Sequence, residues 1–240
     1  MAEDKEIESI FTKNNIEGTI VISSLDGSQE YVHNISRAQK RFLPASTFKI
    51  LNSLIALDEN VIKDQYEIIK WDGQDKGWKQ WNKDQTLSTS LPISCIWFYQ
   101  ELAKRIGNEK YLKHLDNIKY GNEKTGTALT TFWLNGELAI SAFEQIEFLK
   151  KLYKKELPYS KNHMELVENL LVVKSEPNTI VRAKTGWAMR INNQHGWYVG
   201  YVEKQDEIWF FATNITINKK QDARFRKEIT FQALEIKEIL

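Results

Sequence analysis

The chain has 240 residues, of which 42% are hydrophobic, and its 33 Lys and Arg against 32 Asp and Glu leave a formal net charge of +1. That length suits one large domain, or two closely packed subdomains, with a substantial core. The near-neutral charge argues against nucleic-acid binding and against a membrane-surface protein, both of which need a basic surface. Apolar runs such as residues 208–212 are far shorter than the roughly 20 residues that cross a bilayer. We therefore expect neither a nucleic-acid partner nor a membrane partner.

Cysteine content and the N-terminus leave the cellular compartment open. Cys95 is the single cysteine, so no internal disulfide can form, and cysteine usage does not separate the cytosol from the periplasm. The first eight residues are acidic and lack the apolar core of a signal peptide. This start fits either a cytosolic protein or a mature form whose signal peptide has been removed.

The N-terminal part predicts two antiparallel strands followed by a buried helix. Residues 19–25 are rich in β-branched side chains, and Asp26-Gly27, a strong hairpin signal, separates them from a second short run through Tyr31-Val32. Between residues 46 and 57, apolar side chains recur at helical spacing.

The middle of the chain is mostly helical, and the last third returns to strands. Three helices are predicted in the middle, over residues 97–106, 141–153 and 161–171. Three strands are predicted after them, over residues 179–184, 196–202 and 207–215. A last helix is expected from about Asp222.

Strands at both ends and helices between them predict an α+β protein. We expect an antiparallel sheet built from both chain ends and flanked by helices, with an inserted, mainly helical subdomain. The prediction is a single domain over residues 1–240. Its sheet subdomain is expected over about 1–60 and 176–240, and its helical subdomain over about 61–175.

A Ser-x-x-Lys element, Ser46 to Lys49, opens the first predicted helix. Three residues make nearly one helical turn, so the hydroxyl and the amine lie on the same face and can meet. A serine becomes a good nucleophile only beside a base, and lysine is such a base only if its pKa falls well below about 10.4. Because lysine is abundant here, one such spacing is also expected by chance.

A second element, Lys184-Thr185-Gly186, ends a predicted strand. A cation and a hydroxyl at a strand edge suit an anionic substrate, and the glycine lets another group approach the backbone. Alone, the tripeptide is equally compatible with a solvated Lys-Thr pair before a turn.

Ser-x-x-Lys followed by Lys-Thr-Gly is the order found in serine penicillin-interacting enzymes. With both in place, the chain resembles the class D, or OXA-type, serine β-lactamases over almost its whole length. The matching segments are residues 42–49, 70–73, 94–96 with 99–100, 120–122, 132–136, 184–186 and 196–200. The resemblance implies the serine β-lactamase and transpeptidase fold, and hydrolysis of the β-lactam amide of penicillin-type antibiotics through an acyl-enzyme on Ser46.

The family's general base is a carbamate formed between carbon dioxide and the lysine that corresponds to Lys49. Only the free amine reacts with carbon dioxide, so Lys49 must sit in an apolar pocket, which Ile96, Trp133 and Leu134 would help to build. The Trp133 indole is the family's donor to the carbamate, with ordinary core packing as its alternative. The resemblance implies no metal and no other cofactor.

Further roles also follow from the resemblance. Ser94 would lie between Ser46 and Lys184 and relay a proton to the leaving lactam nitrogen; its alternative role is to cap the helix predicted from Trp97, and it could serve both. The backbone N–H groups of Ser46 and Trp187 would form the oxyanion hole.

Several side chains are expected to bind the substrate. Arg226 matches the family's carboxylate-binding arginine and is preferred to its competitor Arg224. Trp78 and Met189 occupy positions at which some carbapenem-hydrolysing members bridge the cleft, and here they would either form such a roof or pack into their own loops. The other expected contacts come from Thr185, Gly186 and Tyr120.

The main alternative is a β-lactam-sensing receptor ectodomain, which is acylated and does not turn over. The apolar Ile96, at a position that tends to be polar in such sensors, favours the enzyme, and a penicillin-binding transpeptidase is a weaker third possibility. The four histidines lack metal-ligand spacing. The resemblance implies a periplasmic or secreted protein after removal of a signal peptide, with β-lactams and water as its partners, acting as a monomer or a homodimer.

Overall fold

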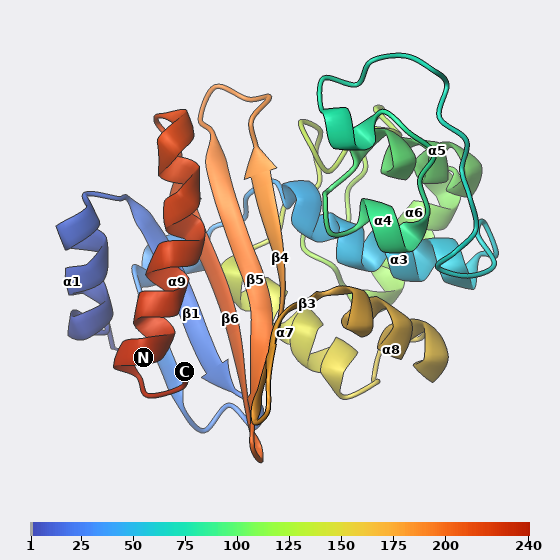
Figure 1. Cartoon of the computed structure of the whole chain (residues 1–240). Helices are drawn as coiled ribbons and strands as arrows, with labels where there is room; N and C mark the ends of the chain where they lie inside the picture. Colours follow the sequence, from blue (N-terminus) through green and yellow to red (C-terminus); the bar gives the residue numbers. More distant parts are fainter. Residues whose placement is uncertain (1) are drawn as a thin grey trace.

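One antiparallel sheet of six strands, in the order β2-β1-β6-β5-β4-β3, organises the computed structural model, which describes residues 2–240 (Figure 1). The strands are β1 (Gly18–Ser24), β2 (Glu30–His33), β3 (Val172–Glu176), β4 (Thr179–Ala188), β5 (His195–Lys204) and β6 (Glu207–Thr216). Strand β1 pairs with β6, so the sheet joins the two ends of the chain. The predicted α+β class and the sheet built from both ends are confirmed.

Helices cover both faces of the sheet. Helices α1 (Lys5–Asn14) and α9 (Phe225–Ile236) lie on one face, where they share a hydrophobic core with alternate side chains of the strands (Figure 1). The larger core lies on the other face, and its helices are α2 (Ile35–Gln39), α3 (Lys49–Asp58), α4 (Leu87–Ser90), α5 (Ile96–Ile106), α6 (Asn108–Ile118), α7 (Ala142–Tyr153) and α8 (Lys161–Leu170). No helix within residues 2–240 is both long enough and apolar enough to cross a membrane.

The strongly patterned elements lie where the sequence predicts them. The strands β1 and β2 pair as expected, with Ile20 opposite His33. Helix α5 ends at Gly107, whose φ of 83° suits glycine, and Ser141 caps α7 by accepting a hydrogen bond from the backbone N–H of Glu144. The strands β4, β5 and β6 are each longer than predicted: β4 continues past Lys184 to Ala188, and β5 and β6 add mostly polar residues at their ends.

Several other helices and strands were not predicted from the sequence. Helices α1 and α6 are amphipathic but mostly polar, and strand β3 is exposed along its whole length, so none of them shows a long apolar run. The last helix is preceded by a 3-10 turn, η3 (Lys220–Arg224), and becomes α-helical only at Phe225.

Helix α3 is the centre of the larger core. Every residue from Lys49 to Leu57 is buried, and the helix packs against α5 and α8. Immediately before it, the ring of Phe48 is fully buried among four aromatic rings, with centroid distances of 5.2 to 6.0 Å to Tyr111, Tyr120, Phe132 and Trp133. Such offset and edge contacts add to the hydrophobic burial of each ring.

Phe48→Ala should lower the free energy of unfolding by about 3 to 5 kcal/mol, because it empties a site that surrounding rings cannot collapse to fill. Urea denaturation measures this loss. The matched control is Val173→Ala, because Val173 is 52% exposed on strand β3, and it should change stability by less than about 0.5 kcal/mol. Equal losses in the two variants would contradict this account of the core.

Candidate active site

Ser46 lies in a tight 3-10 turn, η1 (Ala45–Phe48), which leads directly into α3. Ala45 has a φ of 49°, a left-handed conformation that costs a residue with a Cβ roughly 1 to 2 kcal/mol. A hydrogen bond from the Ala45 N–H to the Trp133 carbonyl, at 2.9 Å, holds this turn in place. The sequence predicts that Ser46 is at the start of an α-helix. In the structure, Ser46 lies instead in the strained turn just before α3, with its side chain half-buried.

The Lys49 amine reaches back along the turn and donates to the Ser46 hydroxyl, with 2.9 Å between Nζ and Oγ. The Lys49 side chain is 0% exposed, and its Nζ lies 5.2 Å from the centre of the Tyr99 ring. Burial, with a smaller contribution from the positive charge of Arg190, lowers the pKa of Lys49 to about 7. Lys49 therefore loses its proton around neutral pH, as a base beside a serine must.

A second lysine approaches from the sheet. Lys184 lies on β4, is 4% exposed, and donates hydrogen bonds to Ser94 Oγ and, at 3.2 Å, to the Thr185 carbonyl. Burial lowers the pKa of Lys184 well below its ordinary value, and the nearby positive charge of Arg226 adds to this effect. The predicted Ser94–Lys184 contact is thus present.

The alternative role of Ser94 as a helix cap is wrong. Helix α5 begins at Ile96 with Cys95 in the cap position, and no side chain caps it. Ser94 instead has a φ of 55°, so its hydroxyl is turned towards Lys184 rather than towards the helix end.

The strand β4 passes unusually close to the Ser46 turn. A Cβ added to Gly186 would lie 2.8 Å from the Pro44 carbonyl oxygen, so only glycine allows this approach. The Ala183 N–H bonds the Leu171 carbonyl on the β3 side of β4, and N–H groups on one edge of a strand recur every second residue. The Trp187 N–H therefore faces the same edge, which is free of β3 at that point and faces the turn.

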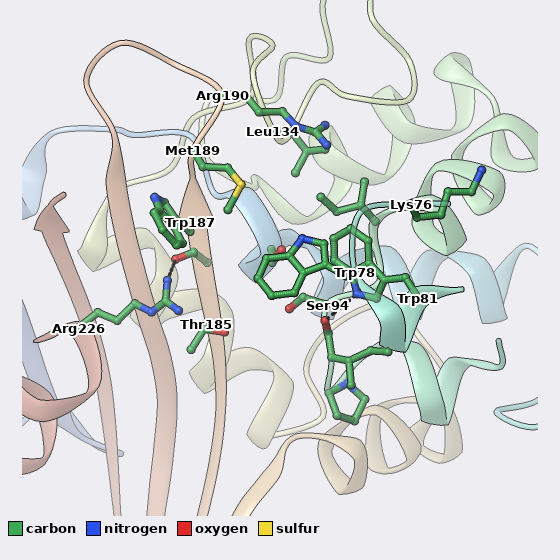
Figure 2. A pocket seen from close by; sticks show the side chains of 15 residues that line it. Lys76, Trp78, Trp81, Ser94, Leu134, Thr185, Trp187, Met189, Arg190 and Arg226 are labelled. Carbon is green, nitrogen blue, oxygen red and sulfur yellow. Dashed lines mark hydrogen bonds between the residues drawn. The ribbon is translucent and has the colours of Figure 1, made fainter. Parts of the chain in front are cut away.

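These groups meet in a cleft of about 300 Å³ between β4 and the helical part of the chain (Figure 2). Most of the predicted site residues line it, namely Ser46, Trp78, Ser94, Ile96, Leu134, Thr185, Gly186, Trp187, Met189 and Arg226. Lys49 and Lys184 lie beneath its floor, each bonded to one of the two serines.

Between the two candidate arginines, the structure brings Arg226 to the cleft and leaves Arg224 outside it. Arg226 donates from Nη1 to the Gly186 carbonyl at 2.9 Å, and its guanidinium lies 6.0 Å from the centre of the Trp187 ring. Burial lowers its pKa to about 10, which leaves it charged at neutral pH. The Arg224 side chain is 64% exposed and pairs with Glu228 on the surface.

Tyr120 does not line the cleft, contrary to its predicted role in substrate binding. Its ring is buried and packs on Phe48 and Phe148, with centroid distances of 5.9 and 5.2 Å. Burial raises the pKa of the Tyr120 hydroxyl, and the same packing keeps this hydroxyl away from the cleft. The motif at residues 120–122 has instead a structural role that the sequence did not predict.

The structural role of this motif comes from Gly121 and Asn122. Asn122 accepts from the Ala139 N–H at 2.9 Å and donates to the Glu137 carbonyl at 2.7 Å, while its own N–H bonds the Ala139 carbonyl. Gly121 lies so close to Ala139 that a Cβ would overlap the carbonyl oxygen. The motif thus clamps the end of the loop that carries Trp133 and Leu134.

Trp133 is fully buried, and within residues 2–240 its indole Nε1 has no hydrogen-bond partner. A buried N–H without a partner costs free energy, so an acceptor bound next to this nitrogen would stabilise the site.

Trp78 and Met189 both line the cleft rim, at 54% and 41% exposed. The Trp78 ring also packs on Trp81 of its own loop, 5.9 Å away between centroids. Their position at the rim fits the prediction that Trp78 and Met189 form a roof over the cleft. The contact of Trp78 with Trp81 fits the alternative, in which Trp78 packs into its own loop.

Five cleft residues were not predicted as site residues, namely Lys76, Trp81, Pro92, Ile93 and Arg190. Of these, Arg190 follows the Lys184-Thr185-Gly186 element by only a few residues, and its charge next to that element was the available signal. The others come from loops whose packing the sequence does not reveal.

Comparisons with known proteins agree with this geometry. The family model described as the penicillin binding protein transpeptidase domain matches residues 9–235. The chain is similar to β-lactamase OXA-48 of Klebsiella pneumoniae (40% identity over 99% of this chain and 90% of that protein) and to β-lactamase OXA-20 of Pseudomonas aeruginosa (41%, 98% and 90%). Among solved structures it resembles the class D β-lactamase YbXI from Nostoc (TM-score 0.95, 40% identity, 98% of this chain and 99% of that one) and FUS-1 (OXA-85) from Fusobacterium nucleatum subsp. polymorphum (0.96, 32%, 100% of both).

The lowered pKa of Lys49 predicts a specific pH dependence of stability. Between pH 7 and about 10 the unfolded chain binds a proton at Lys49 that the folded chain does not, so folding becomes more favourable as the pH rises. Relative to Lys49→Met, the wild type should gain about 1 kcal/mol per pH unit in this window. Urea denaturation of both proteins in buffer free of carbon dioxide measures it, and a constant difference would mean that Lys49 is charged when folded.

Proposed function

The chain belongs to the class D β-lactamases and hydrolyses β-lactams, and from this premise we propose that its substrates are penicillin-type antibiotics, opened through an acyl-enzyme on Ser46. We further propose that Lys49 provides the general base as a carbamate formed with carbon dioxide.

One observation carries the proposal. The Ser46 hydroxyl lies 2.9 Å from the amine of Lys49, whose pKa burial lowers to about 7. A buried, neutral nitrogen beside a serine can take the hydroxyl proton as the oxygen attacks a carbonyl carbon. The same neutral nitrogen is the form of lysine that reacts with carbon dioxide.

The surroundings of Lys49 fit a carbamate. Lys49 is fully buried, with its Nζ against the Tyr99 ring, and the buried Trp133 Nε1, which has no partner within residues 2–240, is a donor that a carbamate oxygen would satisfy. Trp133 would hold the group, and Ile96 and Leu134, which line the cleft above, would limit its hydration. When present, the carbamate supplies a carboxylate-like general base beside Ser46.

Acylation forms a tetrahedral centre whose oxygen becomes negative. The N–H groups of Ser46, at the start of a helical turn, and of Trp187, at the free edge of β4, are suited to stabilise that oxygen. Collapse of this centre breaks the lactam C–N bond, and the nitrogen needs a proton. The Ser94 hydroxyl can donate it and recover one from Lys184, to which it is already hydrogen bonded.

The substrate also carries a carboxylate. Arg226 is charged, lies beside Gly186 and lines the cleft with Thr185, so a guanidinium and a hydroxyl can both bind that group. Water then hydrolyses the ester on Ser46 and releases the opened acid, which separates the enzyme from a sensor that stays acylated. The sensor alternative is not favoured, because the relatives are named β-lactamases over nearly the whole chain. A periplasmic or secreted location is part of this proposal.

Ser46→Ala should abolish covalent labelling by a slowly hydrolysed β-lactam, whereas the wild type should gain the mass of one intact molecule on Ser46. Intact mass spectrometry and peptide mapping measure this. Ser94→Ala is the control, because it leaves the nucleophile in place and should be labelled more slowly on Ser46. An adduct on any other serine would refute the assignment.

Wild-type turnover of benzylpenicillin should fall as the pH drops below about 7, because protonated Lys49 cannot react with carbon dioxide. Added bicarbonate should restore activity near neutral pH, and Lys49→Ala should accumulate acyl-enzyme that bicarbonate does not release. Steady-state rates with and without bicarbonate, with mass spectrometry of the variant, test this. Activity indifferent to bicarbonate across the range would count against the carbamate.

Arg226→Ala should cost about 1.5 to 3 kcal/mol in kcat/KM for benzylpenicillin, mostly through a higher KM, because it removes a charge-assisted contact made in both ground and transition states. Arg224→Ala is the matched control, since it removes the same charge from the surface. A larger effect at Arg224 would show that the carboxylate binds elsewhere.

A further inference from the structure

The cleft carries a positive charge that the roles proposed above do not use. Among the residues that line it within the described chain there are three cations, Lys76, Arg190 and Arg226, and no aspartate or glutamate. Lys76 is neutralised by Asp72, 2.5 Å away, and in Figure 2 its amine points away from Ser94. Arg226 is assigned to the substrate carboxylate, so Arg190 is the cation without a role.

Arg190 stands at the upper rim of the cleft, just beyond the end of β4, and in Figure 2 its side chain lies beside Leu134. The side chain is exposed. Within residues 2–240, the arginines that form ion pairs are others, namely Arg37, Arg41, Arg105, Arg182 and Arg224. The charge of Arg190 is felt in the site, because it adds to the burial that lowers the pKa of Lys49.

The covalent structure of a penicillin sets which part of it can reach Arg190. The reacting carbonyl carbon has two ring neighbours: the nitrogen, which leads to the ring carboxylate, and the carbon that bears the acylamino substituent. The carboxylate and the acylamino substituent therefore leave the carbonyl in opposite directions.

Strand β4 and the turn that follows it present matching groups in the same order. Thr185 and Gly186, with Arg226 bonded to the Gly186 carbonyl, come first, the Trp187 N–H second and Arg190, just past the end of β4, third. With the carboxylate at Thr185 and Arg226 and the carbonyl oxygen at Trp187, the acylamino substituent extends towards Met189 and Arg190. Arg190 follows Trp187 by three residues, which is at most about 10 Å of extended chain. The long Arg190 side chain can bend back and bring its guanidinium closer to Trp187.

We propose that Arg190 is a specificity-determining residue that binds a second anionic group on the acylamino substituent, so that the enzyme favours dianionic penicillins over monoanionic ones of the same shape. This inference rests on the proposed function, since it takes the substrate orientation from it. Guanidinium is well suited to the role, because its planar fork binds a carboxylate through two parallel hydrogen bonds.

The effect should be moderate, because Arg190 is exposed to water and surface ion pairs are weak. A contribution of up to about 1 kcal/mol corresponds to roughly fivefold in kcat/KM. It should also weaken as ionic strength rises.

The experiment compares two penicillins that differ by one carboxylate, namely benzylpenicillin and carbenicillin, its α-carboxy analogue. The measured quantity is the ratio of kcat/KM for carbenicillin to kcat/KM for benzylpenicillin. A ratio is insensitive to damage that slows both substrates equally. The proteins are the wild type, Arg190→Gln, Arg190→Lys, which keeps the charge without the fork, and the control Arg224→Gln, which removes an arginine outside the cleft.

We expect the ratio of kcat/KM for carbenicillin to kcat/KM for benzylpenicillin to fall about fivefold in Arg190→Gln. It should fall less in Arg190→Lys and stay at the wild-type value in Arg224→Gln. In the wild type, the ratio should also decrease between about 0.05 M and 0.5 M salt, and in Arg190→Gln it should not. An unchanged ratio in Arg190→Gln, or an equal fall in Arg224→Gln, overturns the subsite while leaving the proposed function intact. Failure of the wild type to turn over either penicillin would instead refute the proposed function, and the subsite with it.

Discussion

The burial of one amine beside one hydroxyl is the constraint on which the site depends. Lys49 begins the central helix α3, and its side chain is fully buried and ends 2.9 Å from the Ser46 hydroxyl. Removing an ammonium from water is costly, and the cost is relieved by losing the proton, which is why the pKa falls to about 7. The same packing that builds the core therefore produces the base, and the aromatic cluster around Phe48 serves stability and chemistry together.

The second requirement is that the sheet approach this helix closely. Gly186 lets β4 pass against the turn before Ser46, and the approach brings Lys184 to Ser94 from the opposite wall of the cleft. Two lysines are then held near each other with their pKa values lowered by burial, and each is hydrogen bonded to a different serine. The geometry separates the group that activates the nucleophile from the group that serves the leaving nitrogen, which is how one cleft can run both proton transfers.

Much of this could be predicted from the sequence because its signals are local. The Ser46–Lys49 spacing, the Lys184-Thr185-Gly186 element and the alternating strands each follow from a few neighbouring residues, and the structure brings them together as predicted. Tyr120 was misplaced because a motif does not show which of its members faces the cleft; here Asn122 clamps the loop and Tyr120 packs behind it. The strain at Ala45 and Ser94 and the lining by Trp81, Pro92 and Ile93 depend on distant contacts, which no local pattern reports.

The central claim is that Lys49 is neutral in the folded protein near physiological pH, and a titration of its amine tests it most directly. Protein labelled with ¹³C and ¹⁵N in its lysines can be titrated by NMR in buffer free of carbon dioxide, with Lys49→Met used to assign the resonance. We predict that the Lys49 signal titrates near pH 7, well below the exposed lysines. A midpoint near 10, together with the exposed lysines, would contradict the account.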